Sequence, residues 1–310
     1  MTEFLIVGSS GLVGSSVLAK LKERELDAVG VSSKDADLRS TKETFELISN
    51  YKPRYIIDCA AKVGGIKFND TFPVEFLLDN IDIQNNLMRA SHEIGVERFV
   101  FLGSSCIYPR LATQPIKEFS LMTGPLEPTN SSYAMAKIAG IQLVDSYRKQ
   151  YGHKWISLMP TNIYGPNDNF NLETSHVIPA LINKFISAKL ADSREVEVWG
   201  SGNVRREFLF SQDLAIAILF CLEKYDESGP LNIGTGEDIT IRELAELLAE
   251  FTEFEGKIQF NKSYPDGTPR KLLDVSRINK LGWEAQTSLR DGLKSTVEWY
   301  VANMKDRKRF

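Results

Sequence analysis

Two serines, a tyrosine and a lysine are the residues of this sequence whose types and spacing best suit chemistry. Tyr133 and Lys137 are four residues apart in a predicted helix, so the phenol and the ammonium group lie on one helix face within mutual reach. Ser104 and Ser105 follow the apolar run Phe99–Leu102, where a parallel sheet places its ligand-binding residues. The Tyr-x-x-x-Lys spacing is common by chance, but with the serines it predicts a site that reduces a carbonyl or oxidises an alcohol.

A glycine-rich turn follows the first apolar run of the chain. Gly8, Gly11 and Gly14 come directly after Phe4–Val7 and open a predicted helix with the spacing G-x-x-G-x-x-G. Glycine permits the tight turn and the close approach of a pyrophosphate, and the helix amino terminus attracts negative charge. Such a turn also occurs in α/β proteins without a nucleotide, but its place after the first strand predicts a dinucleotide site. We expect the contacts to come from Gly8, Ser9, Ser10, Gly11, Leu12, Val13 and Gly14.

The end of the second predicted strand indicates which dinucleotide is bound. An NAD site usually has an acidic residue there, which holds the ribose 2′-hydroxyl group. This chain instead has Ser32, Ser33 and Lys34, whose hydroxyl groups and single cation suit a 2′-phosphate, so we predict NADP(H). In the alternative interpretation, Lys34 is a solvated surface charge.

Together with the oxidised nicotinamide cation, Lys137 should lower the pKa of Tyr133 from about 10 toward the working range.

The three cysteines, Cys59, Cys106 and Cys221, are widely spaced and form no C-x-x-C pair. Their odd number and spacing argue against a disulfide framework and against a structural zinc, so no metal site is expected. We interpret Cys59 and Cys221 as small buried apolar residues. Cys106 lies two residues after Ser104, and the residues alone leave open whether it packs or reacts.

Of the three histidines, only His176 stands at a position that suggests a role. His92 and His153 fall on a predicted helix surface or loop, and we interpret them as structural. His176 lies between a polar loop and the start of a helix predicted from about Val177 to Leu190. By position alone it is a residue of a helix amino terminus.

Longer stretches of the sequence narrow the interpretation. The glycine turn, Ser104 and Tyr133-x-x-x-Lys137 together resemble the signature of the extended short-chain dehydrogenase/reductase superfamily. Within it, the chain is similar to the family of GDP-L-fucose synthases from Phe4 to about Tyr300. The stretches that carry this similarity are Ala60-Ala-Lys-Val-Gly-Gly-Ile66, Leu102-Gly-Ser-Ser-Cys-Ile-Tyr-Pro109, Leu126-Glu-Pro-Thr129, Pro160-Thr-Asn-Ile-Tyr-Gly-Pro166, Ser175-His-Val-Ile-Pro179 and Pro265-Asp-Gly-Thr-Pro-Arg-Lys271.

The resemblance implies an NADPH-dependent epimerase and reductase that acts on GDP-4-keto-6-deoxy-D-mannose. The serine, tyrosine and lysine that the family uses for reduction match Ser104, Tyr133 and Lys137, and its epimerisation pair matches Cys106 and His176. Cys106 would then act as the base and His176 as the acid on the other face of the sugar. Reduction must come last because it removes the ketone that acidifies the C3 and C5 hydrogens.

The resemblance also implies binding contacts in both halves of the chain. Three positions depart from the family, since Ser10, Lys184 and Lys257 stand where relatives carry arginine, and lysine lacks its bidentate fork. Further cofactor contacts are expected from Leu102, Ser104, Lys137, Pro160, Asn162, Ile163 and His176. Substrate contacts are expected from Lys184, Trp199, Arg206, Lys257 and Lys271, with Arg205 and Arg270 as further cations. Any one of these cations by itself is more often a solvated charge.

Alternating strands and helices must position these residues. Short β-rich runs alternate with segments of helical period through roughly the first 160 residues, as expected for βαβ units on a parallel sheet. We therefore predict an α/β fold with a doubly wound parallel sheet of the Rossmann type. The predicted elements are Phe4–Val7, Leu12–Arg24, Ala28–Val31, Thr41–Tyr51, Tyr55–Asp58, Val74–Gly95, Phe99–Leu102, Ser131–Tyr151 and Trp155–Met159.

After Pro160 the pattern changes to that of a smaller mixed α/β lobe, which we interpret as a substrate-binding cap over the carboxyl ends of the strands. The stretch Pro160–Asn171 and the polar run Val196–Glu207 interrupt the alternation. We expect residues 1–163 and about 204–234 to form the NADP-binding Rossmann domain, and about 164–203 and 235–310 to form the substrate-binding lobe. Further predicted elements are Val177–Leu190, Asp213–Glu223, Leu231–Ile233, Thr240–Phe251, Lys257–Phe260 and Leu289–Val301.

Composition excludes several classes of protein. The chain has 310 residues, of which 43% are hydrophobic and 25% charged, and its net charge of −4 lacks the basic surface that nucleic acid binding requires. The longest apolar run, Leu214–Leu222, is about half of the roughly 20 residues that a membrane helix needs. The first apolar run leads straight into the glycine turn and leaves no room for a secretory signal, so we expect a cytoplasmic protein.

Two alternative functions remain as hypotheses, together with a homodimeric assembly. The chain could be another nucleotide-sugar reductase or epimerase of the same superfamily, or a non-catalytic NADP-binding module. The intact Ser104, Tyr133 and Lys137 argue against the module, and Cys106 with His176 argues against a reductase alone. A homodimer is expected from the resemblance, with the long helices 74–95 and 131–151 paired across a two-fold axis.

Overall fold

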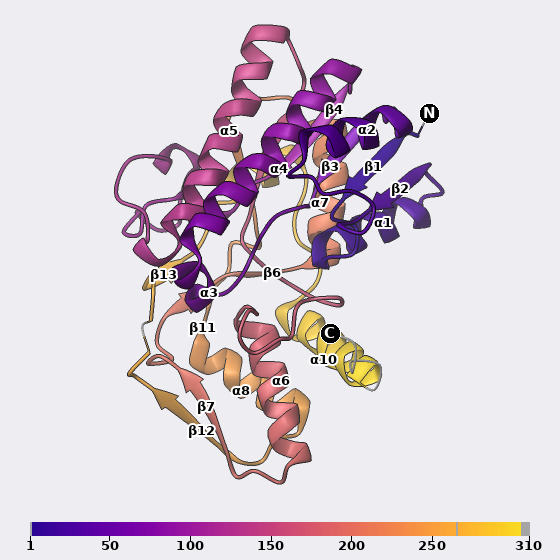
Figure 1. Ribbon diagram of the computed structural model, residues 1–310. Coiled ribbons are helices and arrows are strands. Elements are labelled where there is room, and N and C mark those ends of the chain that lie inside the picture. Colours follow the sequence, from indigo (N-terminus) through magenta and orange to yellow (C-terminus); the bar gives the residue numbers. More distant parts are fainter. Residues whose placement is uncertain (1, 265, 305–310) are drawn as a thin grey trace.

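The central sheet of the protein is parallel and carries helices on both faces (Figure 1). The computed structural model describes residues 2–264 and 266–304, so Pro265, which begins one family motif, lies outside the described residues. The sheet has six strands in the order β10-β5-β4-β3-β1-β2, and the strand order reverses between β1 and β3, as in a doubly wound fold. The strands are β1 (Phe4–Val7), β2 (Ala28–Val31), β3 (Tyr55–Asp58), β4 (Arg98–Leu102), β5 (Ile156–Pro160) and β10 (Pro230–Ile233).

The helices between these strands form two groups. In one group α4 packs between α2 and α5, and in the other α1 packs on α7 (Figure 1). Among the described residues, no helix is both long and apolar enough to cross a membrane. The helices are α1 (Leu12–Glu23), α2 (Thr41–Tyr51), α4 (Pro73–Ile94), α5 (Ser131–Tyr151) and α7 (Ser211–Lys224).

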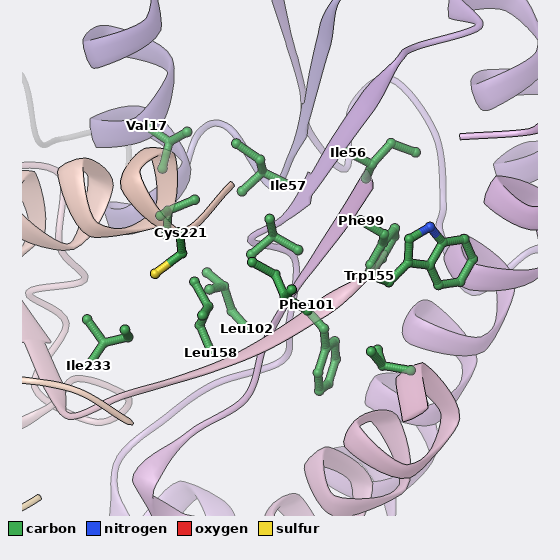
Figure 2. Close-up of a cluster of buried hydrophobic side chains, with 14 of the residues drawn as sticks. Val17, Ile56, Ile57, Phe99, Phe101, Leu102, Trp155, Leu158, Cys221 and Ile233 are labelled. Carbon is green, nitrogen blue, oxygen red and sulfur yellow. The ribbon is translucent and has the colours of Figure 1, made fainter. Parts of the chain in front are cut away.

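A large hydrophobic core fills the space between the sheet and the helices (Figure 2). Side chains on both sides of β4 and β5, such as Phe101 and Leu158, are buried, because a parallel sheet covered on both faces needs apolar residues throughout. Cys221 of α7 lies among these apolar side chains and is fully buried, as expected for a small apolar residue. Burial raises its pKa to about 12.

A second hydrophobic core lies in the other part of the chain, below the sheet in Figure 1. There α6 and α8 pack together, α10 packs on α8, and β7 pairs in parallel with β12. Leu244, Leu248 and Ile182 are fully buried between these elements. The elements are α6 (Val177–Leu190), β7 (Glu195–Trp199), α8 (Ile241–Thr252), β12 (Lys257–Asn261) and α10 (Leu289–Asn303).

Short strands and turns connect the two cores. β8 (Arg205–Arg206) pairs with β11 (Ile239–Thr240) and β13 (Arg270–Lys271), and β6 (Asn162–Tyr164) pairs in parallel with β9 (Phe208–Phe210). Shorter helical elements are α3 (Ile66–Thr71), α9 (Ser276–Leu281), η1 (Ser105–Ile107), η2 (Glu118–Ser120) and η3 (Pro128–Asn130).

A buried carboxylate fixes this junction. Glu207 is fully buried and accepts backbone hydrogen bonds from Thr235 at 2.7 Å, from Gly236 at 2.8 Å and from Leu273 at 2.8 Å. Its own carbonyl oxygen accepts from the side chain of Asn162 at 2.8 Å. One side chain therefore ties together segments that are far apart in the sequence.

Candidate active site

A cavity of about 1860 Å³ lies at the carboxyl ends of the sheet strands, with walls from both hydrophobic cores. It brings together most of the residues that the sequence singled out. Its wall includes Gly8, Ser10, Gly11, Leu12, Val13, Leu102, Ser104, Cys106, Tyr133, Lys137, Pro160, Asn162, Ile163, His176, Lys184, Trp199, Arg206 and Lys271.

Four of the expected contact residues are placed elsewhere. Ser9 packs toward Gly30 of β2, and Gly14 packs on Gly8, where an added Cβ atom would lie 2.3 Å from the Gly8 carbonyl oxygen. Lys34 is exposed in the loop after β2 but does not line the cavity wall. Lys257 is exposed at the end of β12 that pairs with Glu195, whereas the opposite end of this ladder reaches Trp199.

The glycine turn has the shape that a dinucleotide pyrophosphate requires. Gly8 has a φ of +76°, and a Cβ atom there would lie 2.8 Å from the backbone of Cys59 and Ala60, so only glycine fits. Gly11 is the N-cap of α1 and offers no side chain to the first amide groups of the helix, and Leu12 and Val13 line the cavity. An uncapped helix amino terminus that opens into a cavity suits a negatively charged phosphate group. The residues present therefore fit an NADP-type cofactor.

Lys137 is anchored at the end of strand β4. Its Nζ atom donates a hydrogen bond to the Leu102 carbonyl oxygen at 2.9 Å and lies 4.8 Å from the Phe101 ring centroid and 5.9 Å from that of Tyr133. The lysine is almost fully buried. Burial lowers the pKa of its ammonium group, while the negative charge of Asp58 acts in the opposite direction.

In the free protein, which holds no nicotinamide cation, the surroundings of the Tyr133 phenol favour its protonated form. Burial raises the pKa of Tyr133, the charge of Cys106 raises it further, and the hydrogen bond to Ser104 opposes both. Because desolvation disfavours the phenolate, the free protein keeps Tyr133 protonated. A protonated phenol is the form that donates a proton during ketone reduction.

Cys106 and His176 lie in the same wall as the Ser104, Tyr133 and Lys137 side chains. Ser104 is the N-cap of η1, and its hydroxyl oxygen accepts a hydrogen bond from the Cys106 backbone at 3.2 Å. His176 is the N-cap of α6, but its side chain makes no capping hydrogen bond there. The surrounding protein lowers the pKa of His176, and the positive charge of Lys271 lowers it further.

An aromatic pair lines the part of the cavity that is next to the second hydrophobic core. Trp199 stacks on Tyr264 with ring centroids 4.3 Å apart and planes 10° apart. Lys184 donates to the Glu197 carbonyl oxygen at 2.8 Å and lies 5.0 Å from the Trp199 ring centroid. A flat apolar surface next to cations can hold a nucleotide base and its phosphates.

Comparison with known proteins places this geometry in a family. The NAD dependent epimerase/dehydratase family matches residues 4–234. GDP-L-fucose synthase 1 of Arabidopsis thaliana is 49% identical over 306 residues, which cover 98% of this chain and 95% of the relative. The chain belongs to the NAD dependent epimerase/dehydratase family, among its GDP-L-fucose synthases.

Solved structures agree with this membership. A GDP-L-fucose synthetase from Naegleria fowleri bound to NADP has a TM-score of 0.91 at 30% identity, over 98% of this chain and 96% of that chain. A GDP-6-OMe-4-keto-L-xylo-heptose reductase from C. jejuni has a TM-score of 0.93 at 32% identity, over 97% and 98% of the two chains. The α/β fold with a doubly wound sheet that the sequence predicted is therefore confirmed.

Several side chains of the cavity wall were not anticipated from the sequence. Asp58 ends β3, and its charge interacts with that of Lys137. Arg39 lies in the loop after β2, and Asn130 donates a hydrogen bond to the Cys106 sulfur. Tyr264 stacks on Trp199. Asp58 had a detectable signal, because a carboxylate at the end of an apolar strand is rarely buried without a partner. The other three depend on loop conformations that local sequence patterns do not encode.

Proposed function

We propose that the protein is an NADP(H)-dependent enzyme with 3,5-epimerase and 4-reductase activities, which converts GDP-4-keto-6-deoxy-D-mannose to GDP-L-fucose. The names of its close relatives support this activity, and the NADP held by the Naegleria fowleri structure supports the cofactor. One observation in this structure carries the proposal: a single cavity wall holds Tyr133 and Lys137 together with Cys106 and His176. This wall combines groups for carbonyl reduction with groups for proton exchange at carbon.

Reduction uses the residues around the end of β4. The cofactor, when bound against the glycine turn, supplies the hydride that adds to C4. Tyr133 gives its proton to the C4 oxygen, and the Ser104 hydroxyl group donates a hydrogen bond to the same oxygen. The ammonium group of Lys137, fixed by the Leu102 carbonyl group, favours the phenolate that remains after proton transfer.

Epimerisation precedes reduction and needs the C4 ketone. Cys106 removes a proton from C3 or C5, and the electron pair moves onto the ketone oxygen, which Ser104 and Tyr133 stabilise. His176 returns a proton from the opposite face of the sugar and so inverts the carbon. His176 must be an imidazolium ion to give this proton, although burial and the charge of Lys271 lower its pKa in the free protein.

An assay with two readouts tests the proposal. The protein is mixed with GDP-4-keto-6-deoxy-D-mannose and NADPH in deuterated water, NADPH oxidation is followed, and NMR identifies the product and the deuterium at C3 and C5. Cys106→Ser should keep reduction but yield mainly the unepimerised sugar with little deuterium, because a hydroxyl group is a poor base compared with a thiolate. Tyr133→Phe should show the reverse pattern: NADPH oxidation falls by orders of magnitude, while deuterium exchange falls much less, because the Ser104 hydroxyl group still stabilises the enolate oxygen.

A reductase without epimerase activity is the second candidate. The structural similarity to the GDP-6-OMe-4-keto-L-xylo-heptose reductase from C. jejuni favours this candidate. In that case wild-type protein would oxidise NADPH but would leave C3 and C5 free of deuterium, and Cys106→Ser would behave as wild type.

The proposed activity also assigns the two parts of the chain. We assign residues 1–163 and about 204–234 to the NADP-binding part, and about 164–203 and 235–310 to the substrate-binding part. The two hydrophobic cores support this division only in outline, because Leu273 and Ile278 belong to the first core and Phe208 belongs to the second. We place the enzyme in the cytoplasm, since its cysteines Cys59, Cys106 and Cys221 are free thiols, as in a reducing compartment.

The enzyme acts as a homodimer through α4 and α5. Sedimentation measurements at micromolar concentration would test whether it is a dimer.

A further inference from the structure

The sulfur atom of Cys106 accepts hydrogen bonds from two side chains that come from distant parts of the fold. Asn130 Nδ2 lies 3.4 Å from Sγ, and Lys271 Nζ also lies 3.4 Å from it. Asn130 ends η3, directly before α5, whereas Lys271 ends the short strand β13. The sequence suggested Lys271 as a substrate contact, but its ammonium group is directed at the thiol.

Hydrogen bonds fix the backbone around Lys271. β13 pairs in parallel with β8, and the Lys271 position is in register with Arg206. The following amide groups are held as well: Leu272 donates to the Gln114 side chain at 2.9 Å and Leu273 to Glu207 at 2.8 Å. These bonds fix the segment on the side of the cavity where Cys106 stands.

The thiol is held equally firmly from its own side. The Cys106 backbone amide group donates to the Ser104 side chain at 3.2 Å, which fixes the main chain at Cys106, and the hydrogen bonds from Asn130 and Lys271 hold the sulfur. Asn130 has one buried side-chain oxygen without a hydrogen-bond partner, and its amide nitrogen is directed at the sulfur. Both partners of Cys106 donate, and a thiolate accepts hydrogen bonds better than a thiol does.

We propose that Lys271 and Asn130 are positioning residues that hold Cys106 as the thiolate base of the epimerisation, a role that rests on the proposed function. The proton moves from C3 or C5 of the sugar to Sγ, and the electron pair of the C–H bond moves onto the ketone oxygen. No oxidant or reductant takes part. The thiol formed then returns its proton to water, so that the thiolate is restored.

Other charged or titratable groups also act on the Cys106 sulfur. Arg206 and Tyr133 both interact electrostatically with Cys106. The charge of Lys271 also acts on the His176 ring. Arg206 adds to the positive field around the sulfur, whereas the Tyr133 phenol is neutral in the free protein. One ammonium group therefore both donates a hydrogen bond to the Cys106 sulfur and acts on the His176 ring before the substrate enters.

The test measures the thiolate directly, without substrate. The alkylation rate of the intact protein with iodoacetamide is recorded against pH, and Cys106→Ser gives the background from Cys59 and Cys221. Burial raises the pKa of both of these thiols, so the background is low. Lys271→Met should slow alkylation of Cys106 at pH 7.5 by about 10-fold and move the profile to higher pH, since a nearby cation favours the thiolate.

Matched variants separate charge from structure. Lys271→Arg keeps the charge and should retain most of the wild-type rate, whereas Asn130→Asp replaces a donor with a negative charge and should slow alkylation at least as much as Lys271→Met. Lys280→Met removes an exposed lysine from α9 and should change nothing. An unchanged alkylation profile in Lys271→Met would overturn the proposal.

A second measurement separates this proposal from the proposed function. With the keto-sugar in deuterated water, Lys271→Met should lose most exchange at C3 and C5 but keep NADPH oxidation. If the variant shifts the alkylation profile while exchange stays at the wild-type rate, Cys106 is not the base, and the epimerase mechanism fails along with the role assigned here. If exchange is normal and only the Michaelis constant for the sugar rises, Lys271 is a substrate contact and the proposal is wrong.

Discussion

At the scale of single residues, Asp58 is the buried charge that the reaction scheme leaves unexplained. It ends β3 in register with Phe101 of β4, the residue whose ring lies under the Lys137 ammonium group. Burial raises the pKa of Asp58 to about 6, and Lys137 counteracts this shift. Above that pH the carboxylate supports the positive charge of Lys137 against the cost of burial.

This pair predicts a pH dependence of the reduction. As the pH falls below about 6, Asp58 gains a proton, Lys137 loses its counter-charge, and NADPH oxidation should slow. Asp58→Asn should reduce the rate at pH 7 and remove the decline near pH 6, whereas Asp192→Asn in the exposed loop after α6 should leave the profile unchanged. Steady-state rates of NADPH oxidation from pH 5 to 8 provide the measurement. Identical pH profiles for wild type and Asp58→Asn would show that the charge of Asp58 does not support that of Lys137.

A second prediction at this scale concerns the 2′-phosphate of NADP. Lys34, which the sequence suggested, does not line the cavity, but Arg39 from the same loop does. Its guanidinium group is held by Asp37 at 2.8 Å and 2.9 Å. Arg39→Ala should raise the Michaelis constant for NADPH about 10-fold while that for NADH changes little, because a charge-assisted contact to phosphate is lost. Lys34→Ala should have the smaller effect, and equal effects on both cofactors would exclude Arg39 from this contact.

At the scale of elements, most of the fold could be predicted from local pattern. The bounds expected for β1, β2, α2, β3, α5 and α6 are those observed, because their apolar periodicity and flanking turn residues define both ends. Helix α3 was not expected, since six residues are too few to show a helical period. The pairing of β7 with β12 was not expected either, because contact between strands far apart in sequence leaves no local signal.

Some functional groups could also be predicted from local sequence, whereas others could not. Ser104, Tyr133 and Lys137 follow from a strand end and one helix face, so the sequence already places them together. Lys271 reaches Cys106 across 165 residues of chain, through a strand of two residues that only the tertiary structure defines. Sequence patterns therefore identify the reacting groups, while the groups that act on them need the folded molecule.

The junction that holds such segments in place can be tested at Glu207. Its carboxylate accepts three backbone hydrogen bonds, and in Glu207→Gln the new amide group would face the donating Leu273 amide and leave it unsatisfied. Burial raises the pKa of Glu207, so removing the charge offsets part of this cost. We expect a net loss of about 1–2 kcal/mol in the free energy of unfolding, measured with urea. Glu197→Gln, on the protein surface, should change it by less than about 0.5 kcal/mol, and equal losses would contradict this role.

At the scale of the whole molecule, the active site exists only because two hydrophobic cores meet. The sheet part supplies the glycine turn, Ser104, Tyr133 and Lys137, while the other part supplies His176, Lys184 and Trp199. Helix α5 carries Tyr133 and Lys137 and packs along α4, to which it is joined by the hydrogen bond from the Gln84 side chain to the Ala136 carbonyl oxygen at 2.8 Å. A contact made on the outer side of these helices is therefore close to Tyr133 and Lys137.

The outer surface of the same two helices bears apolar side chains that a second copy of the chain would cover. Val74 and Leu78 of α4 are 62% and 51% exposed, and Met135 of α5, two residues from Tyr133, is 49% exposed. Apolar residues repeated one turn apart on exposed helices suit a four-helix interface around a two-fold axis. Leu78→Glu would bury a charge in such an interface, so it should convert the proposed dimer to a monomer in sedimentation experiments at micromolar concentration.

The control for this last prediction is Val301→Glu. Val301 of α10 is 52% exposed, nearly the same as Leu78, but it lies in the other part of the molecule. Its substitution should leave the dimer intact, so that a general effect of surface charge is excluded. Because Met135 is so close to Tyr133 along α5, loss of the dimer should also lower NADPH oxidation in Leu78→Glu more than in Val301→Glu. Sedimentation of the wild type as a monomer would remove the interface and, with it, this link between assembly and catalysis.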